Sequence, residues 1–150
     1  MSHLGTVVGC AIVALGMALV PNARADMLIS SQEAALPSAT AAGITFRSVT
    51  RGPKIQLVSP ADASVVHSPV ALHLKFESYG GATIDPASVK VTYMKKPAVD
   101  LTSRVRTYIR PDGVDMETAE IPPGEHVIKV DVTDSQGRAG SNTFMLKVDK

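Results

Sequence analysis

Apolar side chains occupy every second position in several segments of the second half of the chain. In residues 70–76, the side chains of Val70, Leu72, Leu74 and Phe76 point to one side, and the residues between them are mostly polar. Strict alternation of this kind predicts a β-strand with one buried face. The same pattern recurs in three further segments: 89–93, 126–132 and 144–148.

Weaker strand candidates and turn signals fill the intervals between these segments. Residues 55–58 form a short apolar run and 114–121 an irregular one, and in 104–109 apolar or small side chains alternate with Arg or Tyr. Turns are expected at Asp85-Pro86, Pro111-Asp112-Gly113, Pro122-Pro123-Gly124 and Asp134–Gly137. About seven strands with one apolar face each bury those faces most simply when they form two antiparallel sheets packed against each other. We therefore predict an all-β sandwich over residues 53–150.

Residues 1–25 have the features of a secretion signal. The apolar run Val7–Val20 contains 14 residues and would span about 21 Å as a helix, too short for a hydrocarbon core of about 30 Å. A proline ends the run, and the small residues of Ala23-Arg24-Ala25 suit signal peptidase. We therefore predict cleavage after Ala25, with Asp26 as the mature amino terminus in the periplasm or outside the cell. An uncleaved anchor helix is the alternative, because the first residues carry no Lys or Arg.

Charge and cysteine content exclude several classes of partner. The whole chain holds 15 Lys and Arg against 14 Asp and Glu, and the predicted signal contains one Arg and no acid, so the mature chain is neutral. A neutral chain has no general attraction for nucleic acid or for anionic membranes, and we expect no membrane span after signal removal. The single cysteine, Cys10, lies in the predicted signal, so the mature chain can form neither a disulfide nor a thiolate metal site.

Residues 26–52 are rich in Ala, Ser and Thr and show no sustained apolar period. This composition predicts a mostly flexible N-terminal segment that leads into the sandwich. Within it, Ile44 and Phe46 could add a short strand at a sheet edge.

Two stretches carry a family resemblance. Residues 121–138, IPPGEHVIKVDVTDSQGR, resemble the E–F corner, F strand and F–G turn of bacterial immunoglobulin-like domains, and residues 57–66, LVSPADASVV, resemble their A strand and A–B turn. The resemblance covers residues 53–150 and implies a sandwich of about seven strands used for adhesion, scaffolding or ligand presentation. The resemblance rests on turn residues and on alternating apolar positions, so it specifies the fold better than the function.

A second resemblance is to small periplasmic copper-binding sandwiches of the copper-resistance type, through SPAD at 59–62 and PGEH at 123–126. This resemblance implies one histidine at the mature amino terminus and another in the F–G turn. Here Asp26 and the turn Asp134–Arg138 stand in those places, so both implied ligands are missing. Periplasmic copper handling is therefore kept as an alternative function, and no cofactor is expected.

Other chemically active combinations are sparse. The histidines of the mature chain are not spaced as metal ligands, and two are expected at the surface and the third at the core margin: His67, His73 and His126. Three acids lie in or near turns and are expected to cap backbone rather than bind calcium: Asp112, Asp115 and Asp134. The sequence has no nucleophile elbow and no phosphate-binding loop, so we expect no enzyme activity. An accessory role in an envelope enzyme complex is a further alternative.

Basic and acidic residues are segregated along the chain. Residues 88–110 hold six basic residues against Asp100, and residues 111–134 hold seven acids against Lys129. The basic residues are Lys90, Lys95, Lys96, Arg104, Arg106 and Arg110. If the two segments pair across strands, their charges neutralise each other at about 0.2–1 kcal/mol per pair. If they lie apart, the basic segment forms a binding patch for an anionic polysaccharide or another envelope protein.

These features together predict a non-catalytic, exported, immunoglobulin-like module for binding or structural spacing in the bacterial cell envelope. Loops on a rigid sandwich are where such folds place recognition. The expected contact loops are 79–83, 95–103 and 110–115.

Overall fold

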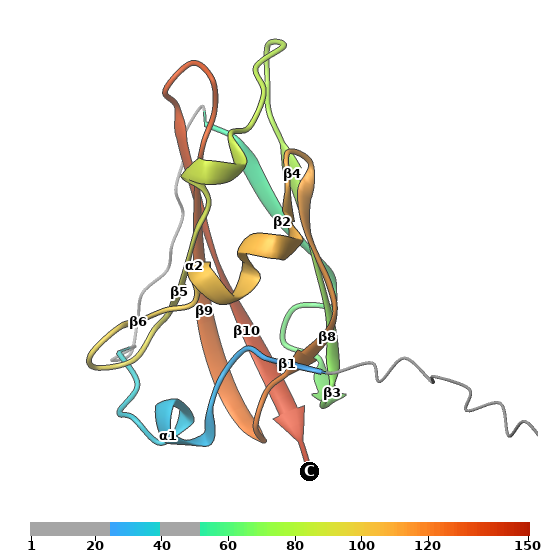
Figure 1. The fold of residues 1–150 in the computed structure, drawn as a ribbon, viewed down its shortest axis with the longest axis vertical. Helices are drawn as coiled ribbons and strands as arrows, with labels where there is room; N and C mark the ends of the chain where they lie inside the picture. The colour runs from blue at the N-terminus through green and yellow to red at the C-terminus, as the bar shows by residue number, and fades with distance from the viewer. Residues whose placement is uncertain (1–24, 40–51) are drawn as a thin grey trace, which may run out of the picture.

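Two β-sheets packed face to face form the protein in the computed structural model, which describes residues 25–39 and 52–150 (Figure 1). The first sheet has the order β1 (Asp26–Met27), β8 (Gly113–Glu120), β4 (Val70–Glu77) and β2 (Lys54–Ser59), with β7 (Ile109–Arg110) also paired to β8. The second has the order β3 (Val65–His67), β10 (Ala139–Asp149), β9 (Gly124–Thr133), β5 (Lys90–Tyr93) and β6 (Val99–Asp100). The short helices are α1 (Ser31–Ala34), η1 (Pro86–Ser88), α2 (Thr102–Val105) and η2 (Arg106–Tyr108).

The predicted all-β sandwich is confirmed. Most neighbouring strands are antiparallel, and the two parallel pairs are β1 with β8 and β3 with β10. The predicted signal before Ala25 and the edge-strand candidates Ile44 and Phe46 lie outside the described residues. Within residues 25–39 and 52–150, no helix is long and apolar enough to cross a membrane.

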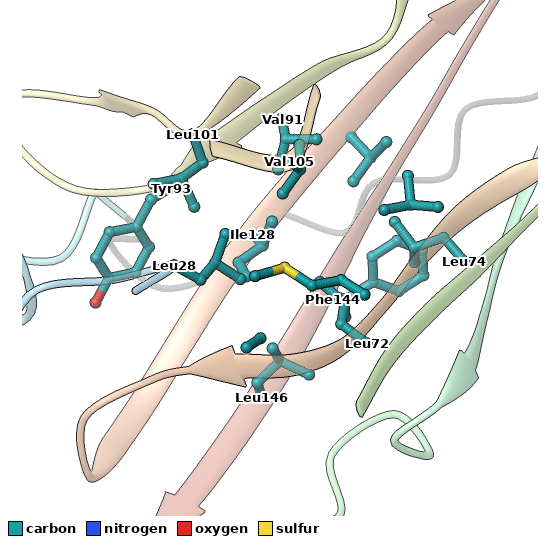
Figure 2. Close-up of a cluster of buried hydrophobic side chains, with 14 of the residues drawn as sticks. Leu28, Leu72, Leu74, Val91, Tyr93, Leu101, Val105, Ile128, Phe144 and Leu146 are labelled. Carbon is teal, nitrogen blue, oxygen red and sulfur yellow. The ribbon is translucent and has the colours of Figure 1, made fainter. Parts of the chain in front are cut away.

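The alternating positions form the core between the sheets. All four apolar residues of β4 singled out by the alternation are buried, as are the corresponding residues of β9 and β10. Figure 2 shows side chains from both sheets, among them Leu72 of β4 and Leu146 of β10, meeting in one cluster. Burying one such side chain contributes about 1.5–3 kcal/mol, so this cluster is the main source of stability.

The irregular pattern of residues 114–121 has a structural cause. β8 lies inside the first sheet between β1 and β4, but its register against β4 shifts between the pairs Val70–Ala119 and Leu72–Met116. Because of this bulge, Met116 and Ala119 both face the core although they are three positions apart. The strand is therefore central even though its sequence lacks a period of two.

The strand predicted for residues 104–109 is wrong. The chain forms the helical turns α2 and η2 there, and only two residues of β7 are extended. Leu101 and Val105 are four residues apart, so one face of a helical turn carries both into the core, where they are buried. The Asp100 carboxylate fixes the start of the turn because it accepts a hydrogen bond from the Thr102 amide at 2.8 Å.

The flexible segment predicted for residues 26–52 is also wrong for its first part. Residues 26–39, here named the N-terminal strap, dock on the sandwich as β1 and α1, at the bottom of Figure 1. Leu28 and Ile29 are 0% and 1% exposed and belong to the core. Ser30 and Glu33 form a capping box that starts α1. Two adjacent core residues and one capping box leave no periodic signal, which is why composition alone misses them.

Candidate binding surface

The fold divides the six basic residues of segment 88–110 into two groups. Four of them are exposed: Lys90, Lys96, Arg106 and Arg110. The other two, Lys95 and Arg104, turn toward the N-terminal strap, and Lys95 is only 7% exposed. The predicted patch is thus smaller than the sequence suggests, because two of its cations hold the fold together.

Arg104 anchors the strap through a carboxylate. Its two terminal nitrogens donate to the two oxygens of Glu33 at 2.8 and 2.7 Å, and one of them also donates to the Leu28 carbonyl at 2.8 Å. The Arg104 hydrogen bonds, assisted by the Ser30 amide and hydroxyl, lower the pKa of Glu33 to about 2. This two-point contact is the strong form of an arginine–carboxylate pair, and it fixes α1 against α2.

Lys95 holds the far end of the strap. Its ammonium group donates to the Ala34 carbonyl at 3.0 Å and lies 5.3 Å from the centre of the Tyr93 ring. Backbone contacts continue along the same line, where the Lys96 amide donates to the Pro37 carbonyl at 2.9 Å. The strap therefore bridges the first sheet, where β1 pairs with β8, and the second sheet, at the end of β5.

Beneath the strap lies a buried pair, Tyr93 and His126. The Tyr93 hydroxyl is 2.8 Å from His126 Nδ1, and His126 Nε2 is 2.8 Å from the Pro122 carbonyl. Because a carbonyl only accepts, Nε2 carries the ring proton and Nδ1 accepts from the hydroxyl. Burial lowers the pKa of His126 and raises the pKa of Tyr93 to about 12, so both stay neutral. His126 lies at the predicted inward position, and both ring nitrogens are used within the fold.

Acid is expected to weaken the strap through Glu33. The pKa of Glu33 falls from 4.5 to about 2 on folding, so its stabilisation is complete above about pH 5 and is lost as the pH falls toward 2. We expect Glu33→Gln to lose about 2 to 3 kcal/mol of unfolding free energy at pH 7. Urea unfolding should show this difference shrinking at pH 3, and a difference that stays constant with pH would contradict the role of Glu33.

Three of the exposed cations, Lys90, Lys96 and Arg106, lie on β5, on the loop after it and on η2. We name them the basic edge. In the part of the chain that the structure describes, none of the three forms an ion pair. The pKa of the neighbouring Asp100 is lowered, first by hydrogen bonds from Thr102 and additionally by the charges of Lys90 and Arg106. Two of these cations therefore flank one acid, and positive charge is in excess.

The acidic segment 111–134 neutralises little of the basic edge. Its acids on β8 belong to the first sheet, whereas β5 belongs to the second. On β9, which does neighbour β5, Asp131 lies directly opposite Lys90, but its carboxylate pairs with Lys129 at 2.9 Å. For the three residues of the basic edge, cross-strand neutralisation, the first of the two arrangements considered from the sequence, is limited to this position.

Arg110 lies apart from the basic edge, in a shallow groove on the first sheet. The groove is lined by both signs of charge, including His73, Arg110, Asp112, Asp115 and Glu117. Within it, His73 Nδ1 is 2.6 Å from the Asp115 carboxylate, in a cross-strand pair of β4 and β8. Across the described residues, no group of three or more His, Cys, Asp or Glu side chains is arranged to hold a metal ion.

One predicted contact loop is braced by a neighbouring turn. Loop 79–83 is tied to the β9–β10 turn because the Ser135 amide donates to the Thr83 carbonyl at 2.8 Å. Asp134 caps this turn by accepting hydrogen bonds from the amide and the Nε of Arg138 at 2.9 and 2.8 Å. Its carboxylate is thus occupied within the turn, as expected from the sequence.

Comparison with known proteins finds similarity among solved structures alone. No family model matches the chain, and no protein with a curated description matches it. Among solved structures, the chain is similar to CopC from Methylosinus trichosporium OB3b, with a TM-score of 0.44 and 20% identity over 64% of this chain and 94% of that chain. This similarity assigns no function to the chain.

Proposed function

We propose that this chain is a non-catalytic, exported β-sandwich module that binds an anionic partner in the cell envelope. The observation that carries the proposal is the basic edge: Lys90, Lys96 and Arg106 are exposed, and none of them forms an ion pair with a described acid. Lys95 and Arg104 bind the strap instead. The sandwich, to which the strap is tied, therefore presents the three cations of the basic edge.

Exposed cations of this kind favour a partner whose negative charges are spaced along a surface. Lys90 is the first residue of β5, and Lys96 lies six positions after Lys90, beyond the end of the strand. Six residues of extended chain span at most about 20 Å. An anionic polysaccharide or the acidic face of an envelope protein presents charge over such a length. Binding of this type gains association rate and specificity from long-range attraction, and it weakens with salt.

Copper handling is the alternative function, and few histidine nitrogens in the described residues are free to bind a copper ion. Both nitrogens of His126 are hydrogen-bonded inside the fold, and His73 is paired with Asp115. The second alternative, an accessory domain of an envelope enzyme complex, differs from the main proposal only in the identity of the partner. Co-purification with an enzyme subunit from the envelope would distinguish it.

The proposal predicts charge-dependent binding of the mature chain, residues 26–150, to an acidic polymer. Titration with alginate in low salt should show binding that neutral dextran does not show. The double variant Lys90→Glu/Arg106→Glu should weaken alginate binding about tenfold or more and reduce its salt dependence.

A matched control separates local from general charge effects. Lys54→Glu/Lys150→Glu makes the same change in net charge at exposed positions outside the basic edge, and it should bind nearly as well as the unmodified chain. Equal losses in both double variants, or no binding of alginate in low salt, would contradict the proposal. Poly-glutamate in place of alginate tests whether the preferred partner is an acidic protein.

A further inference from the structure

The first strand that the structure describes begins directly after the bond where the sequence predicts signal cleavage. β1 begins with Asp26, which pairs with Ala119 of β8, and the Tyr108 hydroxyl donates to its carboxylate. Two residues later, Leu28 is completely buried. The predicted cleavage bond, between Ala25 and Asp26, is therefore directly followed by residues that pair with β8 and pack into the core.

The residues that follow this bond are bound to β8 through their backbone. Met27 lies opposite Glu120, and the amides of Leu28 and Ile29 both donate to the Glu120 carbonyl at 3.0 and 3.3 Å. A peptidase must bind several residues around the cleaved bond in an accessible, extended form, and proteolysis accordingly proceeds from locally opened states. Docking of the strap and binding to the peptidase thus require the same residues.

We propose that the Ala25–Asp26 bond is a processing site that is cut only while the N-terminal strap is undocked, so that signal removal precedes completion of the fold. The inference rests on the proposed export. The step is a hydrolysis: water adds across the amide, Ala25 receives the new carboxylate and Asp26 the new ammonium group. The freed Asp26 then pairs with β8, and Leu28, Ile29 and Glu33 lock the strap in place.

The test compares folded and unfolded full-length chain, residues 1–150, as substrates of purified signal peptidase. Intact mass should identify a product that begins at Asp26. The chain diluted from urea directly into the assay should be cut at least about tenfold faster than the chain folded beforehand. In the folded chain, Leu28→Ala and Arg104→Gln should both raise the cleavage rate, because each loosens the strap, whereas Val65→Ala at an exposed position should not.

Hydrogen exchange of the β9 and β10 amides shows whether a variant has opened the strap or the whole sandwich. Faster cleavage with β9 and β10 still protected supports the proposal. Equal cleavage rates of folded and unfolded chain would overturn it and leave the export proposal standing, and so would a product that begins at another residue. An unfolded chain that is never cut would overturn the export proposal together with it.

Discussion

Replacing Leu28 with alanine is expected to lower the free energy of unfolding by about 2 to 5 kcal/mol, one of the two largest effects of a single change in this protein. Leu28 is 0% exposed and lies in the cluster of Figure 2 with residues of both sheets, although it comes from a segment with the composition of a linker. Truncation removes apolar contacts and leaves a cavity beneath the strap. Urea unfolding followed by far-ultraviolet circular dichroism measures the loss.

The neighbouring Met27 provides the control for this change. Its side chain is 58% exposed, so Met27→Ala should change the unfolding free energy by only about 0.5 kcal/mol. The loss in Leu28→Ala is limited by the docking free energy of the strap, since beyond that limit the strap detaches and the sandwich stays folded. In that case the dependence of free energy on urea should decrease as well. Similar stabilities of the two variants would show that the strap is not part of the core.

Replacing Gly140 with alanine is expected to destabilise the fold by about 3 kcal/mol or more. A β-carbon at this position would lie 2.0 Å from the Pro53 carbonyl oxygen. The clash involves backbone on both sides, because a β-carbon on Gly52 would likewise lie 2.0 Å from the Ala139 carbonyl oxygen. The start of β10 and the chain entering β2 cross at these glycines, so relief requires the two sheets to move apart at this corner.

Gly80 is a suitable comparison for Gly140. Its φ is +67°, and a β-carbon added there would have no atom within 4 Å, so Gly80→Ala carries only the conformational penalty of about 1 kcal/mol. Thermal unfolding of both variants should therefore show a much larger loss for Gly140→Ala. Equal losses would mean that the two sheets do not approach closely at this corner.

The sequence predicts the parts of the fold that depend on one repeated pattern. The alternation in β4, β9 and β10 correctly identifies their buried faces. Residues 104–109 mislead because the apolar partner of Val105 in the helical turn is Leu101, which lies four positions earlier and outside the alternating segment. The bulge in β8 likewise depends on its partner strand, which a single sequence does not reveal.

The candidate site is harder to predict because its contacts join distant parts of the chain. Arg104 and Glu33 are 71 positions apart, and Lys95 and Ala34 are 61 positions apart. From the sequence, all six cations of segment 88–110 are equivalent, whereas the fold uses two of them as anchors and leaves three as the basic edge. The one available signal is the Ser30–Glu33 spacing, which fits a capping box and indicates that an ordered helix begins in the segment expected to be flexible.

The division between anchors and basic edge connects the fold to the proposed function. The strap uses Lys95 and Arg104 to join the two sheets, so the basic edge projects from a support that is tied to both of them. Charge reversal at Arg104 is therefore expected to reduce stability, whereas reversal at Lys90 is expected to reduce binding. Measuring both properties in both variants separates the two roles.

Amide hydrogen exchange tests most directly whether residues 26–39 are part of the folded unit. In the docked strap the Leu28 amide donates to the Glu120 carbonyl and the Ala34 amide to the Ser30 carbonyl, so both should exchange at least about a hundredfold more slowly than in an unstructured peptide. Gln32, exposed in the first turn of α1, serves as the fast-exchanging reference. Slow exchange at Leu28 and Ala34 is the result we predict, and exchange of Leu28 at the rate of an unstructured chain would show that the strap is not docked on the sandwich.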